Sequence, residues 1–210
     1  MKPLVVLLHG LARGHGSMAK LGAYLRTQGF DTWAKTYPSR KHSIAYLASA
    51  LSDQLVDYAG ERPLCAVTHS MGGIIVRHLQ DPRLNWSRIV MLAPPNGGSR
   101  IAAGLVRNPL FRWFYGPAGS ELADAAAWPA PPAPFAVIAG TRSRALSNVT
   151  SWTVGRRFTQ DVANDGTVAV EETRLQGMAA FAEVDATHTW IMNSLEVRRL
   201  VVNYLNYGAF

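Results

Sequence analysis

The residues with the clearest chemical potential lie around Ser70. An apolar run at residues 64–67 leads toward Ser70, and Gly72 and Gly73 follow it. A strand, an abrupt turn with a serine at its tip and a helix form the layout of a nucleophile elbow, G-x-S-x-G, here with Thr68 in the place of the first glycine. Small residues after the serine let the helix and the strand pass closely. The stretch therefore predicts a nucleophilic hydroxyl held clear of a sheet.

A serine hydroxyl needs a base to take its proton and a carboxylate to orient that base. His188 stands late in the chain, just after the last predicted strand, where the base belongs if the order is serine, acid, histidine. A capping or surface histidine before the final helix remains the alternative interpretation of His188. The other five histidines are interpreted as structural or loop residues: His9 and His69 beside backbone features, His15 and His42 in early loops, and His78 on the elbow helix.

The acid is expected between the fifth and sixth predicted strands. Asp165 lies at the tip of an Asn-Asp-Gly turn at residues 164–166. Asp-Gly is also a common turn former, so the tripeptide alone does not decide. Its place in the chain order favours Asp165, and Asp161 and Asp185 are kept as alternatives.

Two backbone amides are candidates for stabilising a developing oxyanion. The amide of Met71 is free at the start of the elbow helix, where it can face negative charge. The second donor is expected in the loop after the first strand, and there the amide of Leu11 is the best candidate because Gly10 lets the backbone turn toward the site.

The elements that must position these groups alternate along the chain. Apolar runs predict strands at residues 4–8, 30–37, 64–67, 88–93, 135–140 and 179–184, with helical patterns between them. Ser17 and Ser43 are predicted helix N-caps, and the apolar stripe of the second helix includes Tyr58. The alternation predicts an α/β fold with a doubly wound, mainly parallel sheet of about six strands. In such sheets chemistry gathers at the carboxyl ends of the strands.

Two stretches do not fit this alternation. Residues 99–134 carry aromatics early, and the segment is interpreted as a small lid or cap excursion over the site. Its aromatics could line an acyl pocket or merely cover the sheet edge, and pocket linings and cores share that composition. The candidate substrate contacts are Phe111, Trp113 and Phe114. Residues 141–159 show no clear period and are expected to be irregular.

The totals are those of one globular domain spanning residues 1–210. The formal net charge is +7, but the basic residues are spread along the chain, so nucleic-acid binding is not expected. A solvated basic surface is favoured, and attraction to anionic substrates or lipid surfaces stays open. The single cysteine, Cys65, is expected to be buried and fits a reducing compartment.

No signal peptide is evident and no apolar run approaches the length of a membrane span, so the cytoplasm is the simplest expected location. The chain has no H-E-x-x-H helix, no paired cysteines and no phosphate-binding loop. Neither a metal nor an organic cofactor is therefore expected.

Taken together, these motifs resemble those of the α/β-hydrolase superfamily, and within it the small bacterial lipases and esterases. The resemblance rests on His9-Gly10, on residues 68–73 and 164–168, and on Thr187-His188, and it extends over nearly the whole chain. It implies ester hydrolysis through an acyl-enzyme, with Ser70, Asp165 and His188 as the triad and a small or lipid-like ester as the substrate. A thioesterase or amidase with the same triad is the alternative within enzymes, and a non-catalytic binding protein on the same fold is the alternative outside them.

Overall fold

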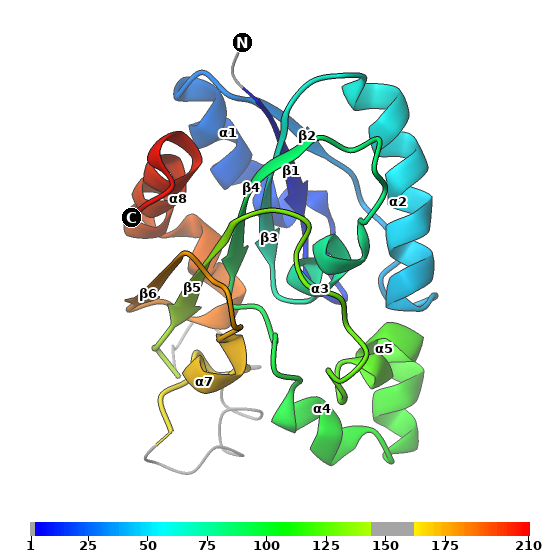
Figure 1. The fold of residues 1–210 in the computed structure, drawn as a ribbon. Helices are drawn as coiled ribbons and strands as arrows, with labels where there is room; N and C mark the ends of the chain where they lie inside the picture. Colours follow the sequence, from blue (N-terminus) through cyan, green and yellow to red (C-terminus); the bar gives the residue numbers. More distant parts are fainter. Residues whose placement is uncertain (1–2, 144–161) are drawn as a thin grey trace.

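The computed structural model describes residues 3–143 and 162–210. Six strands form one sheet in the order β2-β1-β3-β4-β5-β6, and every neighbouring pair is parallel (Figure 1). The strands are β1 (Leu4–Leu8), β2 (Asp31–Ala34), β3 (Leu64–His69), β4 (Trp86–Leu92), β5 (Phe135–Gly140) and β6 (Ala180–Val184). This sheet confirms the predicted fold class, although the second strand is four residues long rather than eight.

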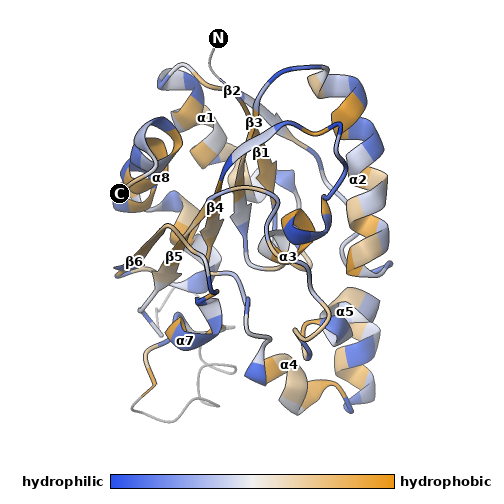
Figure 2. Cartoon of the chain, viewed as in Figure 1, coloured by the Kyte–Doolittle hydropathy of each residue, from blue (hydrophilic) through white to orange (hydrophobic). Residues whose placement is uncertain are grey.

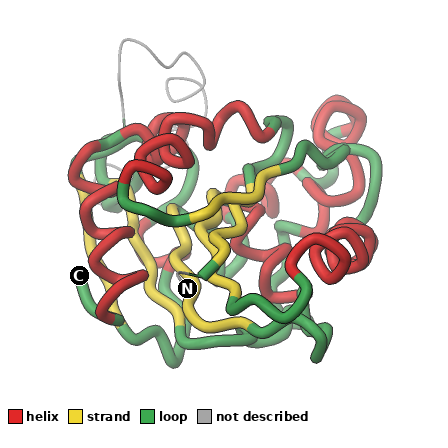
Figure 3. The backbone as a smooth tube through the Cα atoms, turned by 90° about the horizontal axis from the view of Figure 1, so that it is seen from above, coloured by secondary structure: helices red, strands yellow, loops and turns green. Residues whose placement is uncertain are grey.

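Helices cover both faces of the sheet. On one face α2 (Ile44–Ala59) and α3 (Met71–His78) share an apolar cluster with β1, β3 and β4, and on the other α1 (Ala19–Thr27) and α8 (Leu195–Tyr207) share a second cluster. Figure 2 shows the hydrophobic strands between these helices, whose outer faces are mixed or hydrophilic. The view from above in Figure 3 shows the strands enclosed by helices on either side. The core therefore consists of two layers separated by the sheet.

The remaining helices lie beyond the carboxyl edge of the sheet or next to it. They are η1 (His15–Met18), α4 (Arg100–Leu105), α5 (Pro109–Glu121), α7 (Val170–Thr173) and η3 (His188–Asn193). In Figure 1, α4, α5 and α7 lie at the end of the sheet toward which the strand arrows point. Within the described residues, no helix combines the length and the apolar character needed to cross a bilayer.

A topological switch point lies between β1 and β3. The two strands are neighbours, with Leu8 paired to Thr68 at their carboxyl ends. The chain leaves β1 toward α1 on one face and leaves β3 toward α3 on the other. Where adjacent strands send their connections to opposite faces, a crevice opens outside the carboxyl ends of the strands. The loops that carry Leu11 and Ser70 form the two sides of this crevice.

Two local predictions were wrong and one is confirmed. Ser43 caps α2, because its hydroxyl accepts a hydrogen bond from the amide of Tyr46 at 3.2 Å. Ser17 lies inside η1 instead of capping a helix, and its hydroxyl donates to the carbonyl of Gly14. Tyr58 is 54% exposed, because at the last turn of α2 its ring lies on the surface under the guanidinium of Arg62 rather than over the sheet.

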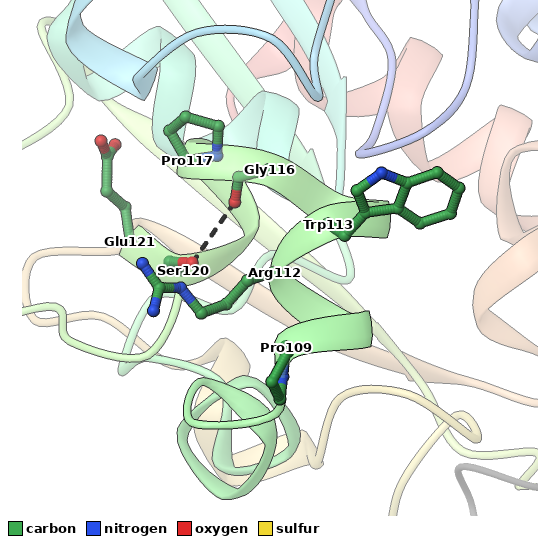
Figure 4. Close-up of a pocket in the computed structure, with 7 residues that line it drawn as sticks. All are labelled: Pro109, Arg112, Trp113, Gly116, Pro117, Ser120 and Glu121. Carbon is green, nitrogen blue, oxygen red and sulfur yellow. Dashed lines mark hydrogen bonds between the residues drawn. The ribbon is translucent and has the colours of Figure 1, made fainter.

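Residues 99–134 contain α4 and α5, and α5 is interrupted at Gly116. This residue has φ 67° and ψ −163°, and Pro117 follows it inside the helix. A side chain at Gly116 would overlap the carbonyl oxygen of Arg40, so only glycine fits where α5 approaches the chain before α2. Figure 4 shows this kink, with the hydroxyl of Ser120 donating to the Gly116 carbonyl. From residue 144 on, the predicted irregular stretch 141–159 lies outside the described residues.

Candidate active site

Ser70 occupies a sharp turn between β3 and α3. Its backbone has φ 53° and ψ −124°, a region that non-glycine residues rarely adopt and that costs about 1–3 kcal/mol. Flanking hydrogen bonds hold it there. The amide of Ser70 donates to the carbonyl of Leu92, and the carbonyl of Ser70 accepts from the amide of Gly73. The predicted elbow is therefore a strained turn fixed by its neighbours.

Glycines make this turn sterically possible. A Cβ at Gly72 would lie 2.7 Å from the carbonyl oxygen of Leu8, and one at Gly10 would lie 2.9 Å from Nδ1 of His69. The start of α3 thus lies against the end of β1, and the two loops of the crevice touch. Thr68 is fully buried, and its hydroxyl has no hydrogen-bond partner among the described residues.

Three side chains that are distant in the sequence form one chain of hydrogen bonds. Nε2 of His188 lies 3.0 Å from Oγ of Ser70, and Nδ1 of His188 lies 2.7 Å from Oδ2 of Asp165. Because a carboxylate oxygen can only accept, Nδ1 carries the hydrogen and Nε2 is free to accept from the serine hydroxyl. The side chains of Asp165 and His188 are only 1% and 10% exposed, so little water competes for these bonds.

The acid is held by its own turn. Oδ1 of Asp165 accepts hydrogen bonds from the amides of Thr167 and Val168 at 3.0 and 2.8 Å. The carbonyl of Asp165 also accepts from the amide of His188, so the two loops are joined by backbone as well as side chain. Asn164 closes the turn, since its side chain accepts from the amide of Gly166.

The two alternative acids do not take this place. Asp185 is exposed and forms an ion pair with Arg142, whose hydrogen bond lowers the pKa of that carboxyl. Asp161 lies outside the described residues. The residues that the sequence singled out as Ser70, Asp165 and His188 are the three that the structure brings together.

Glu172 is a supporting residue that the sequence analysis did not identify. Its carboxylate accepts from the amide of Ala169 at 2.8 Å and from the amide of Arg100 at 2.7 Å. It therefore ties the loop of Asp165 to the start of α4, and burial raises the pKa of its carboxyl. Its contact with Arg100 spans 72 residues, and no local pattern could have revealed it.

His9 supports the other side of the crevice, as its structural interpretation expects. Its ring stacks on Tyr37 with centroids 3.8 Å apart, its Nε2 accepts from the amide of Tyr37, and its Nδ1 donates to the carbonyl of Gly10. The hydroxyl of Tyr37 donates to the carbonyl of His9. Burial lowers the pKa of His9 to about 4, so the ring is neutral near pH 7.

His69 lies directly behind His188. Its Nε2 donates to the carbonyl of His188 at 2.9 Å, and the two ring centroids are 4.8 Å apart. Burial lowers the pKa of His69 well below its usual value. The ring is thus a neutral support for the backbone that carries His188.

The amides of Leu11 and Met71 lie at the two sides of the crevice. Leu11 follows β1 and Gly10, and Met71 is the first residue of α3. Neither amide donates to a protein acceptor among the described residues. Both N–H groups therefore lack a described acceptor, and their role as oxyanion donors stays a prediction.

A cleft of about 410 Å³ opens over Ser70 and His188. One wall is apolar and comes largely from the α4–α5 segment: Ile101, Leu105, Phe111, Phe114 and Leu122. Phe111 and Phe114 thus lie where a substrate contact was expected. Trp113 does not line this cleft: it is 82% exposed, and Figure 4 shows its indole projecting from α5. A larger hollow of about 650 Å³ on α5 is lined by none of Ser70, Asp165 and His188.

No group of histidine, cysteine, aspartate and glutamate side chains among residues 3–143 and 162–210 could hold a metal ion. The chemistry that the arrangement offers is a hydroxyl nucleophile, a base, and two backbone donors at the mouth of an apolar cleft. Cys65 is buried in β3 and is a free thiol.

Comparisons with known proteins agree with this fold. A model of the alpha/beta hydrolase family matches residues 5–202, whereas a sequence search of curated proteins finds no match. The mature form of Bacillus licheniformis lipase BlEst2 is similar, with a TM-score of 0.76 and 17% identity over 100% of this chain and 93% of that one. The propeptide form of the same lipase has a TM-score of 0.80 and 17% identity, covering 97% of this chain and 50% of that one. The metagenomic carboxyl esterase MGS0156 has a TM-score of 0.66 and 17% identity, covering 93% of this chain and 69% of that one. At these identities the likeness shows a shared fold.

Proposed function

Because this chain belongs to the alpha/beta hydrolase family, we propose that it is a serine hydrolase that cleaves carboxylic esters through an acyl-enzyme. The observation that carries the proposal is the continuous set of hydrogen bonds from Ser70 through His188 to Asp165, at 3.0 and 2.7 Å, on the floor of a cleft. Solved structures that share the fold include a lipase and a carboxyl esterase, which supports the same class of leaving group.

Each atom of the site has a role in the proposed reaction. Oγ of Ser70 attacks the ester carbonyl while Nε2 of His188 takes its proton, and Asp165 keeps Nδ1 protonated and the ring in place. The carbonyl oxygen, now negative, accepts from the amides of Leu11 and Met71, and the loss of one such donor typically costs about 10²–10³ in rate. His188 then protonates the leaving alcohol, and water cleaves the acyl-enzyme by the same route.

The lining of the cleft favours an ester with a hydrocarbon part. Its wall on α4 and α5 is apolar, with Phe111 and Phe114 among its aromatics. Burial of each CH₂ against such a wall contributes about 0.8 kcal/mol, so longer acyl chains bind better until the wall ends. A lipid-like or medium-chain ester fits this cleft best.

A fluorophosphonate probe tests the proposal directly. We expect the native protein to form an adduct that mass spectrometry places on Ser70, and Ser70→Ala to lose both the adduct and the hydrolysis of 4-nitrophenyl esters. Ser99→Ala is the matched control, because Ser99 lines the same cleft but caps α4 through the amide of Ala102. It should keep labelling, at a stability cost of about 1 kcal/mol for the lost cap. Absence of both adduct and esterase activity in the native protein would refute the proposal, and faster cleavage of matched acyl-thioesters or amides would reassign the leaving group.

A further inference from the structure

One charged side chain faces the apolar cleft. Arg13 follows Leu11 by two residues in the loop after β1, and it lines the cleft together with Ser70 and His188. Its Nη1 donates to the carbonyl of Thr189 at 2.8 Å, and its guanidinium lies 5.8 Å from the centroid of the Trp190 ring. The guanidinium is therefore held next to Thr189, the residue that follows His188.

The guanidinium has no counter-ion among residues 3–143 and 162–210. Five described arginines lie within 4 Å of a carboxylate, namely Arg62, Arg83, Arg100, Arg142 and Arg174. Arg13, like Arg77, is one of the others, which form no salt bridge with any described residue. Among the residues that line the cleft it is the single lysine, arginine, aspartate or glutamate. Partial burial lowers the pKa of Arg13, although a guanidinium stays charged at every working pH. A partly desolvated cation without a counter-ion among the described residues is costly, and an anion that enters the cleft relieves that cost.

The donor geometry also leaves room for a ligand. A guanidinium carries five N–H groups in a planar fork that matches carboxylate and phosphate oxygens. One of them is used on Thr189, and the guanidinium also lies 5.8 Å from the centroid of the Trp190 ring. The cleft thus has an apolar wall on α4 and α5 and a cationic end at Arg13, with Ser70 in the same cavity.

We propose that Arg13 binds an anionic group carried by the substrate, so that the preferred substrates are esters of anionic amphiphiles, in which a phosphate or carboxylate lies within reach of the scissile bond. The hydrocarbon part lies against the α4–α5 wall, and the anion accepts from the guanidinium N–H groups that are not used on Thr189. This inference rests on the proposed esterase function. It assigns to Arg13 the role of a specificity residue.

A purely structural role is the competing explanation, because the bond from Arg13 to Thr189 also steadies the loop after His188. Matched substrates separate the two. One pair is 1-decanoylglycerol and 1-decanoylglycerol 3-phosphate, and the other is 4-nitrophenyl hexanoate and mono-4-nitrophenyl adipate, all used below their critical micelle concentrations. The first pair places the anion on the alcohol as phosphate, and the second places it on the acyl chain as carboxylate.

The variants are Arg13→Gln, Arg13→Lys and, as a control that removes the same charge from the surface of α8, Arg199→Gln. We expect the native protein to prefer the anionic member of at least one pair. In Arg13→Gln, kcat/KM for that member should fall about tenfold or more, mainly through KM, with less than about a threefold change for its neutral partner, as expected for the loss of one charged hydrogen-bonding group. Arg13→Lys should recover part of the loss, and Arg199→Gln should match the native protein.

An equal loss of kcat/KM for the anionic and neutral members in Arg13→Gln would show that Arg13 has only a structural role. A preference of the native protein for both neutral members would also overturn the inference. Failure of the esterase proposal is recognised separately, by the absence of a fluorophosphonate adduct. Binding provides a second readout that needs no turnover. In calorimetry, the Ser70→Ala variant should bind 1-O-decylglycerol 3-phosphate more tightly than 1-O-decylglycerol. Adding Arg13→Gln to Ser70→Ala should abolish this difference in affinity. Equal affinities in Ser70→Ala would contradict the inference.

Discussion

Replacement of Asp165 by asparagine tests the proposed triad with the least change in shape. In the native turn, Oδ1 accepts from the amides of Thr167 and Val168, while Oδ2 faces Nδ1 of His188 at 2.7 Å. In Asp165→Asn the two backbone amides demand an acceptor, so they select the amide oxygen for the Oδ1 position. The new NH₂ group then points at Nδ1 of His188 and donates to it.

The consequence follows from the tautomer of the imidazole. A ring that accepts at Nδ1 carries its hydrogen on Nε2, and Nε2–H cannot take the proton of Ser70. The wrong tautomer in an otherwise intact triad costs about 10⁴ in kcat, which corresponds to about 5.5 kcal/mol in the activation free energy. The buried hydrogen-bond count changes little, so we expect the thermal midpoint to fall only by a few degrees.

The assay is steady-state hydrolysis of a 4-nitrophenyl ester, with circular dichroism to verify folding. Asp185→Asn is the matched control, because Asp185 is an exposed acid that pairs with Arg142 and lies three residues before His188. It should change kcat by less than about threefold, since surface ion pairs contribute about 0–1 kcal/mol. If Asp165→Asn kept kcat within about tenfold of the native value while folded, the tautomer argument would be refuted. If Asp185→Asn abolished activity instead, the acid would have been misassigned.

Two further predictions concern the frame around the site. The pKa of His9 is about 4 in the folded state, against an ordinary value of 6.5. Between these two pH values the unfolded chain therefore binds more protons than the folded one. The neutral His9 ring contributes about 3 kcal/mol to the free energy of unfolding above about pH 6.5, and this contribution is lost as the pH falls toward 4. Urea titrations should show a weaker pH dependence over that range in His9→Gln than in the native protein, and identical slopes would contradict this origin. Gly116→Ala should lower the free energy of unfolding by more than Gly60→Ala, because both glycines have positive φ but a Cβ at Gly116 overlaps the Arg40 carbonyl and one at Gly60 meets nothing within 4 Å. Strain alone costs about 1–3 kcal/mol, so equal losses would mean that α5 moves away from Arg40 without cost.

The parts of the fold that depend on local pattern could be predicted from the sequence. The fifth strand occupies residues 135–140 as expected, because an uninterrupted apolar run suits a strand covered on both faces. Ser70, Asp165 and His188 could be grouped without coordinates for a related reason. Each follows a predicted strand, or lies in the loop between two, and the carboxyl ends of parallel strands share one edge of the sheet.

The rest depended on contacts that no local pattern encodes. Trp113 and Phe114 are neighbours on α5, and the orientation of that helix over the cleft decides that Phe114 lines it and Trp113 does not. The bonds of Glu172 to the start of α4 and of Arg13 to Thr189 join segments 72 and 176 residues apart. Tyr58 continued the spacing of its apolar stripe, but in the last turn of α2 the buried residues are Leu55 and Ala59, and the Tyr58 side chain lies beside that packed face on the surface.

The neutral state of His69 has a consequence for the proposed reaction. During proton transfer His188 becomes positively charged, and the ring of His69 lies 4.8 Å away. A charge on His69 would oppose that step by about 3 kcal/mol at an effective dielectric constant of 20, which is about a hundredfold or more in rate. Burial lowers the pKa of His69 and so removes this repulsion, while its Nε2–H still donates to the carbonyl of His188. A buried histidine behind the base can therefore support it mechanically without raising the energy of its charged form, which a lysine or arginine at the same position could not do.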